Sequence, residues 1–384
     1  MSKLNVDTIE PEGASTTLTL GASGDTVDLS NAAVTLPDSA YLANRNRIIN
    51  GAMQIAQRGT TGTAGAGGSY LACDRWKAWD ASDAAVTVSQ EADGPTGQFT
   101  KCLKYNITTA DASITVSQFG MIRQMIEGNN IIGLGFGTAS AQSVTISFWV
   151  KSSLTGSHGG ALNNGNEDRS YPFAYTVSSA DTWEKKSVTI SGDTSGTWDT
   201  DSTAGMIVTF GLGTGTTYQG TADEWQAGNY FQPSGTIQNI GTISNWNVTG
   251  VQLEIGDTAT PFEHKTYGQE LAACQRYCEK LHGDTAIEMV SMQFAYNTTA
   301  TEGILYYLLK RANPTITQYS TGASGWKISY STSASVLSAV PTFDLITLTN
   351  SRITASISSG LTALQGCYLR TDEDTSYIIV DAEL

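Results

Sequence analysis

Aromatic, amide and carboxylate side chains on predicted strands are the residues of this chain whose types and spacing could do chemistry. In VTISFWVK, at 144–151, apolar residues alternate with polar ones, which predicts a half-buried strand with Trp149 on its outer face. An aromatic ring packs against the C–H face of a sugar, while amides and carboxylates bind its hydroxyls. The candidate glycan-binding residues are therefore Trp149, Gln118, Gln124, Gln252 and Glu254. The alternatives are that a loop or a neighbouring chain covers Trp149, and that Glu254 makes a structural hydrogen bond or salt bridge.

Motifs for catalysis are scarce in comparison. The histidines His158, His264 and His282 lack the spacing of metal ligands, and neither GxSxG nor GxxxxGK[ST] occurs. We expect no metal centre and no cofactor, except that Asp168 in the loop NNGNEDRSYPF could help to hold a structural calcium ion. The two carboxylates of a glycosidase can come from separate strands, so hydrolysis stays an alternative. Its candidate residues are Glu127, Asp168, Asp181, Glu184 and Glu254.

Composition and charge restrict the function classes. Charged residues make up 15% of the 384, well below the usual ~25%, and the many Gly, Thr and Ser residues favour a β-rich protein. A formal net charge of -15 excludes a nucleic-acid partner, which would need a Lys/Arg surface, and no run approaches the ~18 apolar residues of a membrane span. Five cysteines are too few and odd in number for a disulfide framework. The start MSKLNVDTIEPEG predicts no signal peptide, hence folding in the cytosol.

The elements that position the candidates are predicted to be mainly β. A jelly-roll β-sandwich is predicted at 44–263. Its short strands are expected near 86–88, 103–107, 114–116, 144–151, 173–177, 186–190 and 206–212. The outer side of the central strands of such a sandwich often makes a concave sheet. In the last strand Trp246 and Val248 are out of phase with Val251 and Leu253, which predicts a bulge near Gly250.

Residues 1–43 predict an N-terminal segment that needs partner chains. Pairs of apolar residues alternate with Gly, Ser, Asp and Asn turns, and each pair is too short to bury its face within one chain. Three copies wrapped about one axis would bury this stripe, giving a trimeric β-repeat stalk; the alternative is a flexible tail. The stripe consists of Leu18, Leu20, Val27, Leu29, Val34 and Leu36.

A helical neck is predicted at 264–282. Apolar residues at spacings of 4, 3, 4 and 3 form a heptad seam, which in a trimer would face the axis. Two heptads are short for a coiled coil, so a helix that packs on its own domain is the alternative. The seam residues are Tyr267, Leu271, Cys274, Cys278 and Leu281.

Residues 283–384 predict a smaller β-sandwich that forms a C-terminal tip. Its strand candidates lie at 290–296, 304–309, 315–319, 343–348, 353–357, 367–369 and 377–380. Loops at such a tip are exposed, and the candidate receptor contacts are Trp326, Tyr296 and Tyr319, with Trp326, between Gly325 and Lys327, as the one most expected to be exposed. Core packing is the alternative for these side chains.

Several motifs in this order carry a resemblance to a known family. They are KLNVDTIEP, TTLTLGASGDTV, NRIINGAMQIAQRGT followed by DRW, SFWVKS, WNVTGVQLEIGDTATPFE, QRYCEKL and the ending DAEL. Together they resemble the tail fibres of bacteriophages, particularly short-tailed phages of aquatic bacteria, over nearly the whole chain. The middle region also resembles carbohydrate-binding jelly-roll modules of secreted enzymes.

The resemblance implies a homotrimer in the virion tail, assembled in the host cytoplasm and acting at the host cell surface. Its N-terminus would attach to other tail proteins, and the chain would bind a host-surface glycan or protein for adsorption. A tail-borne polysaccharide depolymerase is the enzyme alternative. A single-chain carbohydrate module from some other secreted protein is the third.

Overall fold

The structure, a computed structural model, describes residues 44–283, 285–331 and 333–384. All of the described residues lie within one compact unit. The predicted N-terminal stripe of Leu18, Leu20, Val27, Leu29, Val34 and Leu36 lies outside the described residues.

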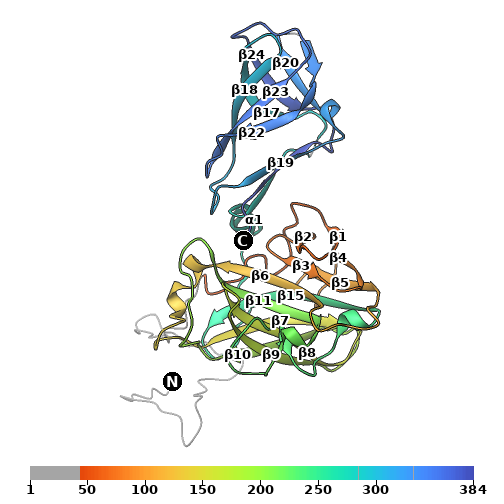
Figure 1. The fold of residues 1–384 in the computed structure, drawn as a ribbon, viewed down its shortest axis with the longest axis vertical. Helices are drawn as coiled ribbons and strands as arrows, with labels where there is room; N and C mark the ends of the chain where they lie inside the picture. Colours follow the sequence, from red (N-terminus) through yellow and green to blue (C-terminus); the bar gives the residue numbers. More distant parts are fainter. Residues whose placement is uncertain (1–43, 284, 332) are drawn as a thin grey trace, which may run out of the picture. The chain divides into compact units, whose positions relative to one another are not determined.

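The region predicted as a sandwich contains two large antiparallel sheets (Figure 1). The first has, in spatial order, β1 (Thr61–Thr63), β4 (Ala85–Glu91), β5 (Cys102–Thr109), β15 (Ser244–Ile255), β7 (Val144–Ser152) and β10 (Glu184–Ile190). The second has β13 (Gln226–Ala227), β9 (Arg169–Val177), β8 (Gly156–Asn164), β11 (Ala204–Thr214), β6 (Phe119–Glu127), β3 (Lys77–Asp80) and β2 (Ser69–Tyr70). The mainly β, jelly-roll-like sandwich expected from the sequence is confirmed.

The core of this sandwich follows from strand alternation. In β7, Val144, Ile146, Phe148 and Val150 are all buried, as their spacing predicts, while Trp149 is half-buried on the other face. Aromatic rings join the two sheets across the core: the Phe148 ring of the first sheet lies 5.0 Å from the Phe210 ring of the second. Ile114 and Val116 were predicted as a strand, but none of the described strands pairs with them: Ile114 lies in irregular chain and Val116 in a turn.

The bulge predicted in β15 is present. The register of β15 against β7 shifts between Thr249 and Gln252, and Gly250 between them has φ +61°. A Cβ at Gly250 would lie 2.5 Å from the Phe99 ring, so this position needs glycine for both its backbone conformation and its packing.

The neck differs from its prediction. Helix α1 spans Tyr267–Gln275, begins with a capping box between Thr266 and Gln269, and ends before the seam is complete. Cys278 and Leu281, predicted on the helix, belong to strand β16 (Cys278–Leu281), which pairs with β25 near the C-terminus. The prediction of a single helical seam over 264–282 is therefore wrong. From Cys278 on, the backbone pairs with β25, a strand about a hundred residues later, and these hydrogen bonds replace those of a helix.

Four of the five neck residues are buried or half-buried within the chain itself. Cys274 and Cys278 are inaccessible, and Leu281 packs against the core of the tip. Tyr267 is exposed and Leu271 half-buried, and their contact with another copy stays a prediction.

The tip contains a seven-stranded antiparallel sheet and a three-stranded sheet, which share a core around Trp326. The larger sheet has β21 (Ser333–Val336), β20 (Trp326–Tyr330), β24 (Gly366–Thr371), β17 (Met289–Ala295), β18 (Ala300–Tyr306), β23 (Asn350–Ser356) and β22 (Ala339–Asp344). The smaller sheet has β16, β25 (Tyr377–Asp381) and β19 (Thr315–Tyr319).

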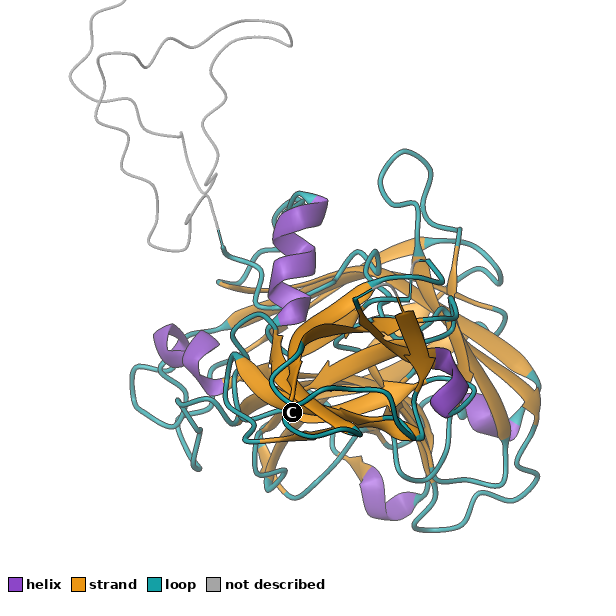
Figure 2. Ribbon diagram, turned by 90° about the horizontal axis from the view of Figure 1, so that it is seen from above, coloured by secondary structure: helices purple, strands orange, loops and turns teal. Residues whose placement is uncertain are grey.

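Helical segments are few and short (Figure 2). Besides α1 there are one-turn segments η1 (Gly128–Asn130), η2 (Ile132–Leu134), η3 (Thr216–Tyr218), η4 (Asn239–Gly241) and η5 (Ala323–Gly325), and a two-strand parallel pair, β12 (Gln219–Gly220) with β14 (Gln232–Pro233). In the part of the chain that the structure describes, no helix has the length and hydropathy of a membrane span.

Candidate functional site

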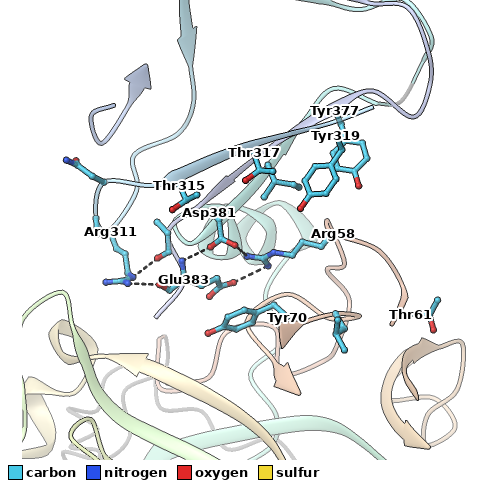
Figure 3. A pocket seen from close by; sticks show the side chains of 15 residues that line it. Arg58, Thr61, Tyr70, Arg311, Thr315, Thr317, Tyr319, Tyr377, Asp381 and Glu383 are labelled. Atoms are coloured by element: carbon cyan, nitrogen blue, oxygen red, sulfur yellow. Dashed lines mark hydrogen bonds and ion pairs between the residues drawn. The ribbon is translucent and has the colours of Figure 1, made fainter. Parts of the chain in front are cut away.

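A pocket of about 630 Å³ opens beside the ladder between β19 and β25. Its other wall comes from the chain between Arg58 and Leu71, so residues near both ends of the described chain meet there (Figure 3). The lining residues are Arg58, Thr61, Tyr70, Leu71, Arg311, Ala312, Asn313, Thr315, Thr317, Tyr319, Tyr377, Ile379, Asp381, Ala382 and Glu383.

Strand alternation decides which side chains reach the pocket. β19 and β25 pair with Thr315 opposite Asp381, Thr317 opposite Ile379 and Tyr319 opposite Tyr377, and all six line the pocket. The residues between them, Ile316, Ile378 and Val380, point the other way and pack in or against the core of the tip. One face of the ladder therefore builds the core while the other presents two tyrosines, two threonines and a carboxylate.

The two tyrosines form an aromatic wall. The rings of Tyr319 and Tyr377 stack with their centroids 4.8 Å apart and 14° between their planes. Figure 3 shows them side by side on the strand ladder. Tyr319 is 45% exposed, so its ring is available to a ligand, and the Nζ of Lys280 lies 4.7 Å from the centroid of the Tyr377 ring.

Three charged groups of the pocket, Arg58, Asp381 and Glu383, are paired with one another. The guanidinium of Arg58 donates from Nη2 to Asp381 Oδ2 at 3.0 Å and from Nη1 to Glu383 Oε1 at 3.2 Å, as the dashed lines in Figure 3 show. Glu383 also pairs with the buried Arg75. Burial alone would lower the pKa of Arg58, but the carboxylates of Glu383 and Asp381 raise it above its ordinary value.

The last residues of the chain are held by hydrogen bonds at the same place. Arg311 donates to the carbonyl oxygens of Ala382 and Glu383, each at 2.6 Å, and the Tyr70 hydroxyl donates to the carbonyl of Leu384 at 3.0 Å. Burial raises the pKa of Tyr70, so its hydroxyl stays protonated and able to donate. These bonds fix the floor of the pocket before any ligand arrives.

This arrangement suits a hydroxylated ligand better than an ionic one. The N–H donors of Arg58 and Arg311 are engaged by carboxylates and carbonyls of the chain, which leaves few of them free to bind an anion. Hydroxyls of Thr315 and Thr317, and the partly exposed carboxylate of Asp381, can exchange hydrogen bonds with sugar hydroxyls beside the tyrosine wall.

The predicted glycan-binding residues do not form one site, although Gln252 and Glu254 contact each other. Trp149 lies on the first sheet of the sandwich, half-buried. Gln124 lies in the second sheet, buried, where its amide exchanges hydrogen bonds with the backbone N–H and C=O of Ile49. Gln118 lies just before the same strand and accepts from the Thr115 N–H at 2.6 Å. Gln124 therefore holds the backbone at Ile49, in the segment that leads into the sandwich, and its amide is not free to bind a ligand.

Gln252 and Glu254 are also internal. Both are buried, the Gln252 amide donates to Glu254 Oε1 at 2.9 Å, and Glu254 Oε2 accepts from the Thr260 hydroxyl at 2.6 Å. The Glu263 N–H donates to Gln252 Oε1 at 2.8 Å. They brace the loop after β15, which is the structural alternative weighed for Glu254, and a ligand cannot reach them without opening that loop.

Part of the outer face of the second sheet is covered by the chain itself. A Cβ at Gly159 of β8 or at Gly211 of β11 would lie 2.5 or 2.8 Å from the Cβ of Gln232 in β14. The two glycines let β14 pack directly on the sheet. The chain therefore occupies this part of the face itself.

In the tip, one predicted contact lies in the pocket and one is wrong. Trp326 is 0% exposed at the centre of the core, because the alternation of β20 turns it and Ile328 inward. Tyr296 is half exposed, beyond the end of β17, and Tyr319 lines the pocket. Sequence reasoning missed Arg58, Tyr70 and Tyr377, and only the matching polar alternation in 315–319 and 377–381 could have pointed to this ladder.

Four of the five carboxylates considered for hydrolysis, Glu127, Asp168, Glu184 and Glu254, have separate structural partners. Glu127 accepts hydrogen bonds from Arg276, Glu184 pairs with Lys186, and Asp168 accepts from the Asn164 amide at 2.5 Å in the turn before β9. Within residues 44–283, 285–331 and 333–384 no group of three or more His, Cys, Asp or Glu side chains could hold a metal ion. Whether the loop around Asp168 binds calcium through backbone carbonyls stays a prediction.

No protein-family model matches the sequence, and no curated protein does either. Among solved structures, the enzymatically active domain of tailspike protein 4 of bacteriophage CBA120 is similar over 55% of this chain and 22% of its own, with 11% identity and a TM-score of 0.30. An arabinose-bound α-L-arabinofuranosidase is similar over 55% of this chain and 26% of its own, with 11% identity and a TM-score of 0.30.

The family 11 carbohydrate-binding module of the cellulase Lic26A-Cel5E of Clostridium thermocellum is similar over 49% of this chain and 91% of its own, with 13% identity and a TM-score of 0.25. The chain thus spans about a quarter or less of the first two structures. At these TM-scores the three likenesses say nothing about its ligand or activity.

Proposed function

We propose that this chain is a glycan-binding subunit of a phage tail fibre, in which three copies assemble and bind a host-surface glycan for adsorption. The observation that carries the glycan part is the pocket beside β19 and β25, where the stacked Tyr319 and Tyr377 adjoin the hydroxyls of Thr315 and Thr317. A sugar ring stacks on an aromatic face through its C–H groups and needs hydrogen bonds for its hydroxyls. This pocket supplies both.

The pairing of charges favours a neutral sugar over an anionic one. Asp381 keeps a partly exposed carboxylate that is held by Arg58, so it can accept from hydroxyls without leaving an unpaired buried charge. Each pocket would bind weakly, and several copies on one fibre would raise the avidity without new contacts. The fibre part of the proposal is supported by the ordered sequence motifs that resemble phage tail fibres, and attachment to other tail proteins is assigned to residues 1–43.

The test is binding of the full chain to an array of neutral and acidic oligosaccharides, followed by calorimetric titration of the best ligand. Replacing Tyr319 with Ala should weaken binding roughly tenfold or more, since an aromatic stacking contact contributes about 0.5–1.5 kcal/mol beyond its burial. Tyr296→Ala is the matched control, because it removes a similarly exposed tyrosine outside the pocket. Loss of binding in the control but not in Tyr319→Ala would refute this site.

The same incubation separates binding from the depolymerase alternative. Asp381 and Glu383 both neutralise Arg58 in the structure, so neither is poised as a free catalytic acid. We expect the oligosaccharide to keep its length after incubation with the protein. New reducing ends would count against a purely binding role.

A further inference from the structure

Exposed apolar side chains are concentrated in the tip. Among the described residues, fifteen of the nineteen large hydrophobic side chains that lie exposed belong to residues 287–368, and only four to the longer stretch before residue 284. The sandwich thus covers its apolar residues within one chain, whereas the tip does not.

Six of these side chains lie on one face of the large tip sheet, and we call them the tip face. The register pairs Met292 with Tyr368 and Phe294 with Gly366 and Glu302, so the tip face lies on the neighbouring strands β24, β17 and β18. The opposite face of the same strands, with Ala295 and Leu305, builds the core of the tip. The tip face consists of Met289, Met292, Phe294, Ile304, Tyr306 and Tyr368.

The tip face is large and hollowed. A pocket of about 560 Å³, with a mostly apolar lining, is lined by five of its six side chains, and Met292 and Tyr306 are 65% and 69% exposed. At these exposures the six side chains leave on the order of 600 Å² in contact with water, which is at the upper end of the largest patch on a typical monomer. It approaches the roughly 800 Å² per partner of a standard protein interface.

Charges flank the tip face with opposite sign. On the β20 side, Lys327 and Arg370 face one carboxylate, Asp372. On the far side, Glu302 and Asp344 share one guanidinium, that of Arg352. A copy turned about an axis parallel to the strands, or several copies arranged around such an axis, brings the positive flank of one against the negative flank of the next.

We propose that further copies of this chain cover the tip face, so that it joins the tips of neighbouring subunits in the fibre. A sugar is a poor occupant, because a surface of methionine, isoleucine and phenylalanine offers few partners for its hydroxyls. The tip face of another copy is equally apolar and carries the complementary flanking charges. It is also always present at the same concentration as the first copy. This inference deepens the proposed assembly of several copies and is independent of the glycan pocket.

The test uses the full chain and a single introduced thiol. All five native cysteines are buried, so a maleimide reagent reports an added cysteine against a low background. Ile304→Cys places the thiol within the tip face, and Ile243→Cys places a control thiol at an exposed position of the sandwich. Light scattering during gel filtration gives the molar mass of each sample.

We expect a mass that is a multiple of the 40.7 kDa chain, and labelling of Ile304→Cys roughly tenfold slower than that of Ile243→Cys, because the interface protects the thiol. Adding Met292→Asp to Ile304→Cys should restore fast labelling, since a carboxylate cannot be buried unpaired in an apolar contact. A monomeric mass, or equal labelling of the two thiols in an oligomer, would overturn the inference. A monomer that still binds glycan would overturn only the inference about the tip face and would leave the proposal of a glycan pocket unaffected.

Discussion

Replacing Glu127 with Gln tests how the sandwich holds the segment that leads into the tip. Glu127 lies at the end of β6 with 1% of its side chain exposed. It accepts from Arg276 Nε at 2.9 Å and Nη2 at 2.5 Å, and from the Tyr277 hydroxyl at 2.9 Å. Arg276 and Tyr277 directly follow α1, so one carboxylate fastens this segment to the second sheet.

The cost of the substitution follows from these contacts. A hydrogen bond to a charged group contributes about 1.5–3 kcal/mol, and Arg276, with 36% of its side chain exposed, can recover part of its loss from water. Tyr277 is buried and cannot. We therefore expect Glu127→Gln to lower the free energy of unfolding by about 2–3 kcal/mol, or about 1 M in the urea midpoint for a typical slope of ~2 kcal/mol per M.

The effect should depend on pH in a defined direction. Burial alone would raise the pKa of Glu127, but hydrogen bonds from Arg276, Tyr277 and Asn129 hold it below its ordinary value. A carboxyl whose pKa is lowered on folding stabilises the protein above its unfolded pKa of about 4.3, and this stabilisation is lost as the pH falls through the folded value. The difference in the free energy of unfolding between wild type and Glu127→Gln should therefore become smaller as the pH falls from 6 to 3.

Urea unfolding followed by tryptophan fluorescence at several pH values measures both effects. Asp257→Asn is the control, because the exposed Asp257 carboxylate accepts from the neighbouring Thr258 hydroxyl and its loss should leave the midpoint unchanged. Equal midpoints for wild type and Glu127→Gln at pH 7 would refute the reasoning on the contacts. A difference in the urea midpoint between wild type and Glu127→Gln that stays constant down to pH 3 would refute the reasoning on the charge.

Three further outcomes follow from the packing. Trp326→Ala should cost about 3–5 kcal/mol, because it empties the centre of the tip core, and chemical denaturation should show an early transition of the tip; an unchanged unfolding curve would contradict its burial. Gly250→Ala should cost about 1–3 kcal/mol in the same measurement, since its φ is positive and a Cβ meets Phe99; a variant as stable as wild type would mean that the bulge can relax. The five native thiols should react with Ellman's reagent only after unfolding, because all are buried and burial raises the pKa of Cys73 and Cys278; rapid reaction of the native protein would contradict this.

The sequence by itself determined the features that depend on local pattern. Alternation in 144–151 placed a strand and the four apolar residues that it turns into the core, and the change of phase around Gly250 placed the bulge. The strands at 315–319 and 377–381 were also predictable, because a strand that buries one face alternates wherever it pairs. These signals lie within a few residues of one another.

Tertiary structure decided the features that depend on distant partners. The chain after α1 becomes a strand because β25 offers it a ladder, and β8 was not predicted because its glycines serve the close approach of β14. The pocket joins Arg58 to Asp381 across more than three hundred residues, and Trp326 turns inward because β20 pairs with β24. Local pattern shows which face of a strand is apolar, but only the register between strands and the packing of sheets decide which polar faces meet.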